Sequence, residues 1–564
     1  MAQTEPALDE VNQQHEEPFY WLNEDSRAFL DDGYLIEGVT AEERVREIAE
    51  RAEEILDDDG FADKFYDYMS RGFYSLASPV WSNFGLDRGL PISCFGSYME
   101  DNMESILYTQ AEVGEMTKLG GGTSGYFGEI RPRGSPITNN GKSNGSYSFT
   151  ELFDTIINVV SQGETRRGQF AGYIDVEHDD LDEWLNIKTE GDPVQDIYYG
   201  VIIGDDWFRA MVDGDEEKRE TWAEIIEARI NIGVPYIIFR DNMNEGKPQV
   251  YKDKGYEINA SNLCTEIALP ATPDESFVCC LSSMNALHYD EWKDTDAVET
   301  LTRFLDAVME EFIQEAEGTQ FMDRPVRFAK RHRAIGIGVL GWHSYLQSEM
   351  IPFDSMEAME KNEAIFRTIK ERSYEESRRL ADEFGEPEVL EGYGRRNATT
   401  MSVAPTKSSS VILGQVSPSI EPLKSNYFVR DGAKLKSTQK NRFLEAILKQ
   451  RGRDEREVWD SIAQNDGSVQ HLDCLTDEEK EVFKTFAEIP QMAIINQAAQ
   501  RQKHIDQAQS LNVSIDPGEV SVKEINQLYI EAWKKGVKSL YYQHSVNAAQ
   551  KFSRDILECK ACES

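Results

Sequence analysis

The feature that most constrains the fold is an alternation of short apolar segments with longer helical patterns between about residues 78 and 542. Residues 201–203 and 236–239 are short, apolar and rich in β-branched and aromatic side chains, as is typical of buried strands. Residues 359–384 instead repeat apolar positions with the period of a helix. Alternation of this kind indicates an α/β fold.

A small helical region is expected ahead of this alternation. Thr40 precedes a good helix start, and apolar residues recur at helical spacing at Val45, Ile48, Ala52 and Ile55. No fixed-period repeat or Ser/Gly linker divides the 564 residues. We therefore expect an amino-terminal arm and helical region over 1–75, one large α/β domain over 76–548, and a flexible polar tail over 549–564.

The charge and cysteine content exclude several classes of protein. A formal net charge of −43 opposes non-specific binding to nucleic acid or to an anionic membrane. Seven cysteines are too few, and odd in number, for a disulfide scaffold, which favours a reducing compartment. There is no secretory leader pattern and no run of about eighteen apolar residues. These features predict a soluble cytoplasmic enzyme.

Asn262, Cys264 and Glu266 form the most informative local pattern. In an extended segment, alternate side chains share a face, so the amide, thiol and carboxylate would converge. A thiol can do radical or nucleophilic chemistry, a carboxylate can move a proton, and an amide can hold a hydroxyl group. The combination suits chemistry on a polyol, whereas a lone cysteine would more often be a core residue.

Other cysteines are candidates for redox chemistry. Cys94 and Cys279 lie in segments that resemble short strands, so the two thiols could meet. Neighbouring residues of a strand point to opposite faces, so only one of Cys279 and Cys280 can face Cys94. Cys559 and Cys562 form a C-x-x-C pair, which is either half of a zinc site or a redox dithiol. No second C-x-x-C completes a zinc site, so we favour the dithiol.

Two regions have the composition of phosphate or nucleotide loops. Residues 405–410, with sequence PTKSSS, precede an apolar stretch, so hydroxyls, one ammonium and backbone N–H groups could hold an anion, although Ser/Thr runs are often simple caps. Glycines at 120–125 are followed by arginines at 131–133 and 166–167, a mixture that suits a nucleotide but also occurs in ordinary turns. Tyr541 and Tyr542, taken alone, indicate packing.

Taken in order, these residues resemble the catalytic, large subunit of class I ribonucleotide reductase. The resemblance runs from about Ser78 to the end of the chain. The matching residues are Ser93-Cys94, the glycine-rich loop from Gly120, Arg166-Arg167-Gly168, Asn262 to Glu266, Cys279, Pro405 to Ser409, Ile420-Glu421-Pro422, Tyr541-Tyr542, and the tail cysteines Cys559 and Cys562.

The resemblance implies a ten-stranded α/β barrel with a central finger loop, and a ribonucleoside-diphosphate reductase. Cys264 would carry a transient thiyl radical that abstracts the ribose 3′ hydrogen. Glu266 would act as the base on the 3′-hydroxyl and Asn262 would bond the ribose. Cys94 and Cys279 would supply two reducing equivalents and become a disulfide, after which Cys559 and Cys562 would reduce them again.

The resemblance also implies two nucleotide sites and a radical route through Tyr541 and Tyr542. Ribonucleoside diphosphate substrates would be held by Ser78, Ser93, Gly122, Pro405, Thr406, Lys407, Ser408 and Ser409. A deoxynucleotide or ATP effector would bind Asp101, Arg131, Arg133, Lys142, Arg166, Arg167 and Gly168 across the interface of a homodimer.

Several partners follow from the resemblance. A separate metal-containing small subunit would generate the radical, so this chain would need no metal and no tightly bound cofactor of its own. Thioredoxin or glutaredoxin would recharge the tail. The opening segment lacks a basic, glycine-containing stretch like the family's ATP-cone. Short chains of this type are familiar from the class Ib branch and from bacteriophages. If the source is viral, the expected location is the host cytoplasm.

Three alternatives stay open at this point. A class II reductase would use adenosylcobalamin, but Tyr541-Tyr542 argues against it. A class III enzyme would carry a glycyl motif near its carboxyl terminus, where this chain has a dithiol. A nucleotide-binding regulator without activity would bind nucleotides without turnover, although all the chemical residues are intact.

Overall fold

The computed structural model describes residues 8, 11, 17–163, 166–431, 436–516, 518 and 520–545. The predicted redox tail with Cys559 and Cys562 lies outside these residues. Within the described ranges, the helices are all too short or too polar to cross a lipid bilayer.

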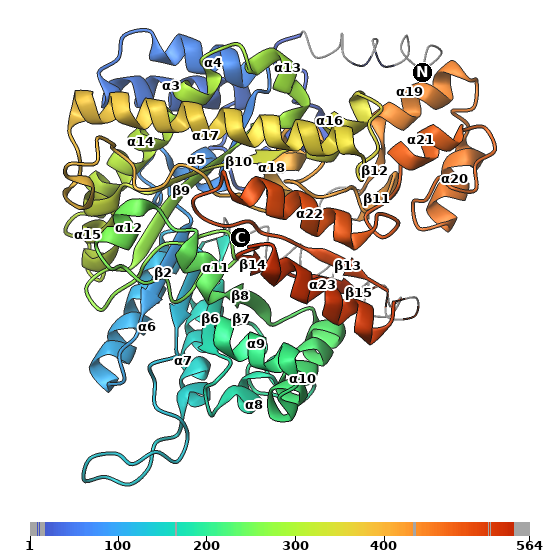
Figure 1. The fold of residues 1–564 in the computed structure, drawn as a ribbon. Helices are drawn as coiled ribbons and strands as arrows, with labels where there is room; N and C mark the ends of the chain where they lie inside the picture. The colour runs from blue at the N-terminus through green and yellow to red at the C-terminus, as the bar shows by residue number, and fades with distance from the viewer. Residues whose placement is uncertain are drawn as a thin grey trace.

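Among the described residues, the predicted amino-terminal helical region contains α2 (Glu24–Asp31), α3 (Ala41–Leu56) and α4 (Phe61–Ser70). Thr40 caps α3 with a reciprocal capping box, in which its hydroxyl accepts from the Glu43 N–H and the Glu43 carboxylate accepts from the Thr40 N–H. Helices α3 and α4 contact α14 (Ala297–Ala316) at the top of Figure 1, so this region shares one continuous core with the rest of the chain.

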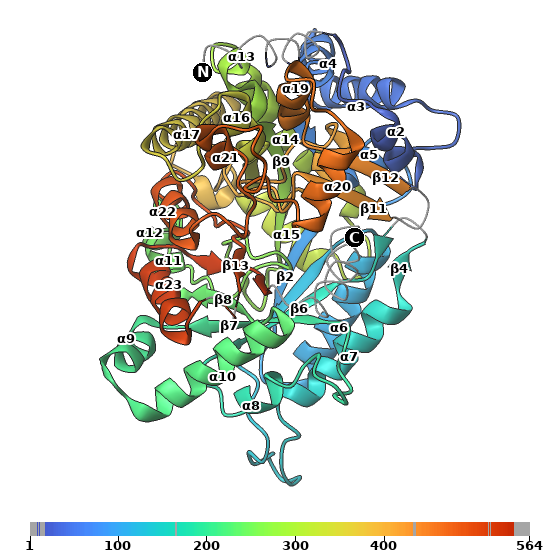
Figure 2. The same cartoon turned by 90° about the vertical axis from the view of Figure 1, so that its right-hand side faces the viewer.

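The first half of the main domain is a parallel sheet of five strands: β2 (Cys94–Tyr98), β3 (Thr123–Tyr126), β6 (Phe170–Asp175), β7 (Tyr198–Ile203) and β8 (Tyr236–Phe239). Parallel strands need crossover helices, which cover the outer face of the sheet in Figure 2. These helices are α6 (Met103–Lys118), α7 (Ser146–Val159), α8 (Leu181–Trp184), α9 (Asp205–Asp213) and α10 (Glu216–Ile232).

The second half repeats this parallel arrangement. Strand β9 (Phe277–Asn285) pairs with β10 (Ile335–Leu340), and single parallel bridges then join β10 to Met401 and Val403 to Gln509. The chain continues into β13 (Val513–Ile515), which is parallel to β15 (Gln543–Ser545). The covering helices are α14, α15 (Asp323–His332), α16 (Trp342–Ser348), α17 (Met356–Phe384), α22 (Gln491–Gln502) and α23 (Val522–Lys534).

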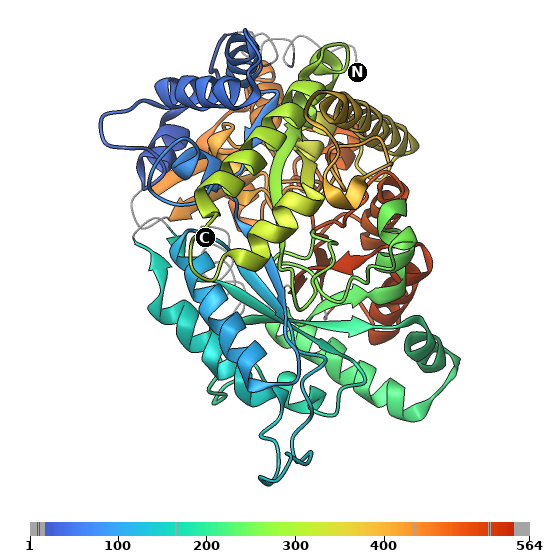
Figure 3. The same ribbon diagram turned by 90° about the vertical axis from the view of Figure 1, so that its left-hand side faces the viewer.

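The two halves join at both edges through antiparallel pairs. Strand β2 pairs with β9, and β14 (Ser539–Leu540) pairs with β8. Ten strand positions form a ring when the extended segment 399–403 is one position, 507–511 with β13 is another, and β14 with β15 is a third. A bond from the Tyr541 N–H to the Leu511 carbonyl at 2.8 Å closes this ring, in agreement with the predicted barrel. The fan of strands from blue β2 to green β8 is seen in Figure 3.

The remaining elements lie around the barrel. Strand β1 (Tyr74–Leu76) spans the expected boundary at residue 75 and pairs with β9. The others are α5 (Ser78–Asn83), β4 (Ser161–Gln162), β5 (Arg166–Arg167), α11 (Arg240–Glu245), α12 (Gln249–Asp253), η1 (Ala286–His288), α13 (Tyr289–Trp292), η2 (Glu388–Leu390), α18 (Lys407–Ile412), β11 (Tyr427–Asp431), β12 (Lys436–Lys440), α19 (Arg442–Gln450), α20 (Arg456–Gln464) and α21 (Asp477–Val482).

Candidate active site

The finger loop, residues 258–271, carries the Asn262–Glu266 segment between β8 and β9. The expectation of an extended segment is wrong here, because residues 263–265 form a turn and Thr265 has a left-handed backbone with φ of 69°. A β-branched residue in this region is strained by about 1–3 kcal/mol, so the surrounding structure must hold it. The predicted finger loop itself is confirmed.

Four hydroxyl groups from barrel strands hold the backbone carbonyls of this turn. Each hydroxyl comes from a different strand position, so the loop is fixed from several sides of the barrel. The bonds run from Tyr173 to the carbonyl of Asn262 (2.5 Å), from Ser510 to Cys264 (2.6 Å), from Ser539 to Thr265 (2.9 Å) and from Ser402 to Glu266 (2.8 Å).

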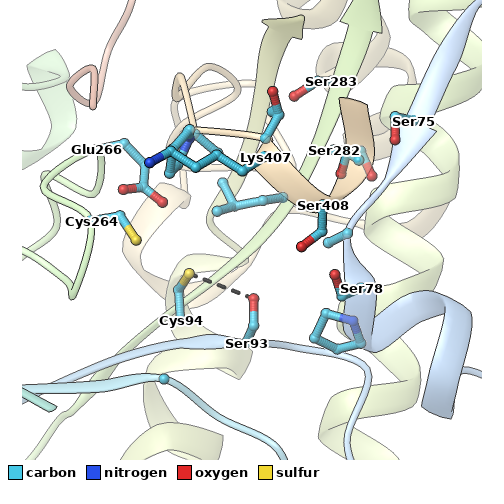
Figure 4. Close-up of a pocket in the computed structure, with 18 of the residues that line it drawn as sticks. Ser75, Ser78, Ser93, Cys94, Cys264, Glu266, Ser282, Ser283, Lys407 and Ser408 are labelled. Atoms are coloured by element: carbon cyan, nitrogen blue, oxygen red, sulfur yellow. Dashed lines mark hydrogen bonds between the residues drawn. The ribbon is translucent and has the colours of Figure 1, made fainter. Parts of the chain in front are cut away.

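A pocket of about 810 Å³, including its open mouth, lies over the turn. In Figure 4, Cys264 and Glu266 lie on one side of it, Cys94 and Ser93 lie below, and Ser408, Ser282 and Ser78 lie opposite. The pocket therefore joins the finger loop, β2, β9, α5 and α18. Its lining residues are Ser75, Ala77, Ser78, Pro79, Ser93, Cys94, Gly122, Asn262, Leu263, Cys264, Glu266, Leu281, Ser282, Ser283 and Ala404 to Ser409.

The amide and the carboxylate of the turn both reach this pocket, although the segment is not a strand. The Asn262 side chain folds back, so that its oxygen accepts from the Ile267 N–H at 3.1 Å and its nitrogen donates to Cys94 Sγ at 3.6 Å. Burial raises the pKa of Glu266 to about 7, against lowering by hydrogen bonds from its own backbone, Ser510 and Asn262. A carboxyl with such a pKa can both accept and return a proton near neutral pH.

Two further thiols face each other across the β2–β9 seam. Cys94 and Cys279 are direct partners in the antiparallel register, so their side chains share a face, as predicted, and Cys280 points away. Neither forms a disulfide in this structure. Cys94 lines the pocket, whereas Cys279 lies buried behind it, where burial raises its pKa well above the usual value.

The adjacent tyrosines Tyr541 and Tyr542 lie beside the finger loop, next to Cys264. Tyr541 donates its hydroxyl to Cys264 Sγ at 3.5 Å, and its ring centroid lies 4.2 Å from that of Tyr542. Both residues lie between β14 and β15 and are buried. The Tyr541 hydroxyl therefore contacts the thiol that lines the pocket, and the Tyr542 ring lies beside the Tyr541 ring.

Residues 405–409 close the far side of the pocket. Lys407 begins α18, and Thr406 before it has φ of 49° while its hydroxyl accepts from the Ser419 N–H at 2.7 Å. Lys407 is the basic side chain among the described residues that line the pocket. Ser78 opens α5 opposite them, and Gly122 allows its strand to approach the Ser93 carbonyl.

The residues predicted for the effector site lie apart from this pocket and in two groups on one chain. Asp101 and Arg131 form an ion pair at 2.6 Å, and Arg133 pairs with Glu183. The loop that carries Arg131, Arg133 and exposed Lys142 precedes α7 and projects from the body in Figure 1. The second group follows the other end of α7 and consists of Arg166, Arg167 and Gly168. A helix of this length separates its two ends by about 20 Å.

Several residues at the site escaped sequence reasoning. Ser75, Ser282 and Ser283 line the pocket, and Ser282 and Ser283 could have been noticed because they follow Cys279 on one strand. Gln507 donates its amide to Cys279 Sγ at 3.2 Å, and Ser510 donates to Glu266. Each of these pairs is separated by more than 220 residues in the chain. No local pattern in the sequence signals such contacts.

Comparisons with known proteins agree on one family. Residues 92–218, 215–392 and 387–543 match the family described as "Ribonucleotide reductase, barrel domain". The solved Actinobacillus ureae class Id ribonucleotide reductase alpha subunit is 59% identical, covers 96% of this chain and 99% of its own, and superposes with a TM-score of 0.90.

Viral relatives extend this agreement. The ribonucleoside-diphosphate reductase large-subunit relative of Frog virus 3 is 38% identical over 532 residues, which is 89% of this chain and 92% of the relative. The large subunit of Invertebrate iridescent virus 3 is 32% identical over 594 residues, or 92% of each chain. The barrel, the finger loop with its thiol and these matches together place the chain in the ribonucleotide reductase large-subunit family.

Proposed function

We propose that this chain reduces ribonucleoside diphosphates to 2′-deoxyribonucleoside diphosphates by radical chemistry at Cys264. The observation that carries the proposal is the meeting of three groups at one thiol. Tyr541 donates to Cys264 Sγ, Glu266 lies two residues away in the same turn, and the Cys94 thiol lines the same pocket. A radical route, a proton acceptor and a reductant are thus all within one site.

The chemistry balances with these groups alone. The Cys264 thiyl takes the 3′ hydrogen, so that a C–H bond breaks and an S–H bond forms, while the Glu266 carboxylate takes the 3′-hydroxyl proton. Asn262 orients the ribose. The 2′-hydroxyl leaves as water with one proton of the Cys94 and Cys279 pair. The other hydrogen of the pair forms the new C2′–H bond, and the two sulfurs give up two electrons and become a disulfide, while Glu266 returns its proton to the 3′ oxygen. Cys264 then returns its hydrogen to the 3′ carbon and is again a thiyl.

The substrate diphosphate would lie at the opposite side of the pocket. Lys407 supplies positive charge there in a chain with a net charge of −43, and the Ser78, Ser408 and Ser409 hydroxyls and backbone N–H groups of the 405–409 loop supply donors. Ser93, Gly122, Pro405 and Thr406 would shape the same wall. This arrangement orients the ribose over Cys264.

Partners follow from the same proposal. A separate small subunit with a metal centre would supply the radical through Tyr542 and Tyr541, and thioredoxin or glutaredoxin would reduce the tail. The two groups of effector residues at opposite ends of α7 could be brought together by a second copy of the chain. Exposed apolar side chains on α6 and α7 support a homodimer there: Met103, Leu107 and Val159.

A single-turnover experiment tests the proposal. Pre-reduced protein is mixed with small subunit, effector and CDP, with no external reductant, and the dCDP formed per chain is counted. We expect product together with a Cys94–Cys279 disulfide, located by peptide mapping. Cys94 and Cys279 still reduced after product formation has stopped would contradict the assignment of the reducing pair.

The tail cysteines give a stoichiometric prediction. If Cys559 and Cys562 pass their electrons inward, the wild-type chain should form about two dCDP per chain without reductant, and the Cys559→Ser/Cys562→Ser variant about one. With dithiothreitol the variant should turn over, whereas with thioredoxin it should not. Equal loss with both reductants would exclude the shuttle role.

The pKa of Glu266 predicts opposite effects of pH on activity and stability. Because Glu266 must be ionised to act as a base, kcat/KM should rise with pH through an apparent pKa of about 7. The folded chain binds this proton more tightly than the unfolded chain does, so its stability falls as pH rises from 4.5 to 7. Glu266→Gln should therefore be inactive, yet more stable than wild type by about 3 kcal/mol near pH 8.

Thermal melting of wild type and Glu266→Gln at two pH values tests the predicted direction in which their stability difference changes with pH. The variant keeps an oxygen that can accept from Ser510, so its advantage should be present near pH 8 and absent near pH 4.5. Equal melting temperatures at both pH values would mean that the Glu266 carboxyl is solvated in the folded chain.

A further inference from the structure

Ser510 contacts the thiol-bearing residue and the carboxylate of the turn with one hydroxyl. Its Oγ lies 2.6 Å from the Cys264 carbonyl oxygen and 2.9 Å from Glu266 Oε2, and the residue is fully buried. The Ser510 N–H donates to the Val403 carbonyl at 2.9 Å, so the barrel backbone fixes where this hydroxyl lies.

The single hydrogen of the Ser510 hydroxyl can be donated to only one of these two acceptors at a time. Serine has one hydrogen to donate and two lone pairs with which to accept. When Glu266 is ionised, the carboxylate is the stronger acceptor, and a hydrogen bond to an ionised group is about twice as strong as a neutral one. When Glu266 is protonated, its O–H can donate to Ser510 Oγ, and the serine hydrogen is then available to the Cys264 carbonyl.

We propose that Ser510 is a positioning residue that couples the protonation of Glu266 to the backbone of Cys264. The hydrogen of its hydroxyl goes to the carboxylate before Glu266 takes a proton and to the Cys264 carbonyl afterwards. No proton is gained or lost at Ser510. The inference rests on the proposed function, because Glu266 takes its proton from the substrate hydroxyl in that scheme.

Among the described residues, the side chains that hydrogen-bond to the Glu266 carboxylate are those of Ser510 and Asn262. The titratable and charged groups that face this part of the site are Cys264 on the finger loop, Tyr173 on β6, Cys94 on β2, Cys279 on β9, Lys407 on α18 and Tyr541 beside Cys264. Burial outweighs the other effects on the pKa of Glu266, and the Ser510 bond opposes it by stabilising the ionised form.

Ser402 provides a matched control. Its hydroxyl also holds the finger loop, but it donates to the backbone carbonyl of Glu266 at 2.8 Å and not to the carboxylate. That carbonyl keeps a second donor, the Ala508 N–H at 2.9 Å, when the serine hydroxyl is removed. Ser510→Ala and Ser402→Ala thus each remove one buried hydroxyl from the loop, and only the first removes a donor to the carboxylate.

The test is the pH profile of kcat/KM for CDP in the complete enzyme with small subunit and effector. Without Ser510 the carboxylate loses a donor, so the acidic limb should move to higher pH by about one unit in Ser510→Ala. Ser510→Thr keeps the hydroxyl and should return the limb to its wild-type position. Ser402→Ala should leave the limb in place. Equal rate loss in both alanine variants without a shift would reduce Ser510 to a structural role and overturn the proposal.

A second measurement does not need turnover. Infrared titration of the Glu266 carboxyl band, identified by its loss in Glu266→Gln, should give a higher midpoint in Ser510→Ala than in wild type. An unchanged midpoint would overturn the proposal even if the enzyme were active. A shifted midpoint in protein that forms no dCDP would instead show that the coupling exists and that the proposed function fails.

Discussion

Cys264→Ser is expected to abolish conversion of CDP to dCDP, with a loss of at least about 10³-fold, even when dithiothreitol replaces the natural reductant. Serine is nearly isosteric and can still accept the Tyr541 hydroxyl, so the pocket should keep its shape. The O–H bond of serine is much stronger than the S–H bond of cysteine, so a radical cannot be formed there and passed to the substrate. Binding of CDP should be unchanged, and equilibrium binding measured beside the activity assay checks this.

Cys474→Ser is the matched control for this experiment. Cys474 is also a half-buried thiol without a disulfide, but it does not line the pocket. Its replacement should leave turnover near the wild-type rate. Dithiothreitol-driven turnover by Cys264→Ser would contradict the assignment of the radical to this residue.

Tyr541→Phe is expected to stop catalysis while nucleotide binding stays intact. Phenylalanine keeps the ring that lies 4.2 Å from Tyr542 and 4.8 Å from Tyr236, so packing is preserved. Only the hydroxyl that donates to Cys264 Sγ is lost. If that hydroxyl is the last step of the radical route, turnover should fall by at least about 10³-fold, measured as dCDP formed with the small subunit.

Tyr199→Phe tests whether loss of any buried tyrosine hydroxyl has this effect. Tyr199 lies on β7 in the same barrel, is fully buried, and has no hydrogen-bond partner for its hydroxyl within the described part of the chain. The variant should be as active as wild type. Retained activity in Tyr541→Phe would return the Tyr541–Tyr542 pair to a packing role.

The sequence predicted the parts of this structure that depend on local patterns. The cap at Thr40, the strands near residues 201 and 236, the long helix that ends at Phe384, and the strand positions of Cys94 and Cys279 are all confirmed. Each follows from side-chain periodicity or from capping chemistry, which act over a few residues. The family resemblance then supplied the closed barrel.

The sequence could not predict what tertiary contacts impose. The turn at 263–265 requires a left-handed Thr265, which local preference disfavours, and hydroxyls from distant strands hold its carbonyls. Segments 399–403 and 507–511 complete the barrel through single bridges, so they lack a regular strand pattern. The role of Ser510 could not be predicted for the same reason, since the two partners of its hydroxyl, Cys264 and Glu266, are about 245 residues away in the chain.

The roles assigned to the individual catalytic, substrate-binding and effector residues stay predictions, as do the homodimer and the external reductant. The roles of Asp101, Arg131, Arg133 and Lys142 in effector binding need a dimer with bound nucleotide, and the roles of the tail cysteines concern residues outside the described ranges. The choice between the class Ib and phage branches also stays a prediction, and the similar solved alpha subunit is of class Id.

The most direct test of the account is conversion of CDP to dCDP with dithiothreitol and an effector, with either a class I small subunit or adenosylcobalamin added. The account predicts product with the small subunit and none with adenosylcobalamin, because the radical enters through Tyr542 and Tyr541. Product with adenosylcobalamin alone would contradict the two-subunit radical mechanism and the role given to the tyrosine pair.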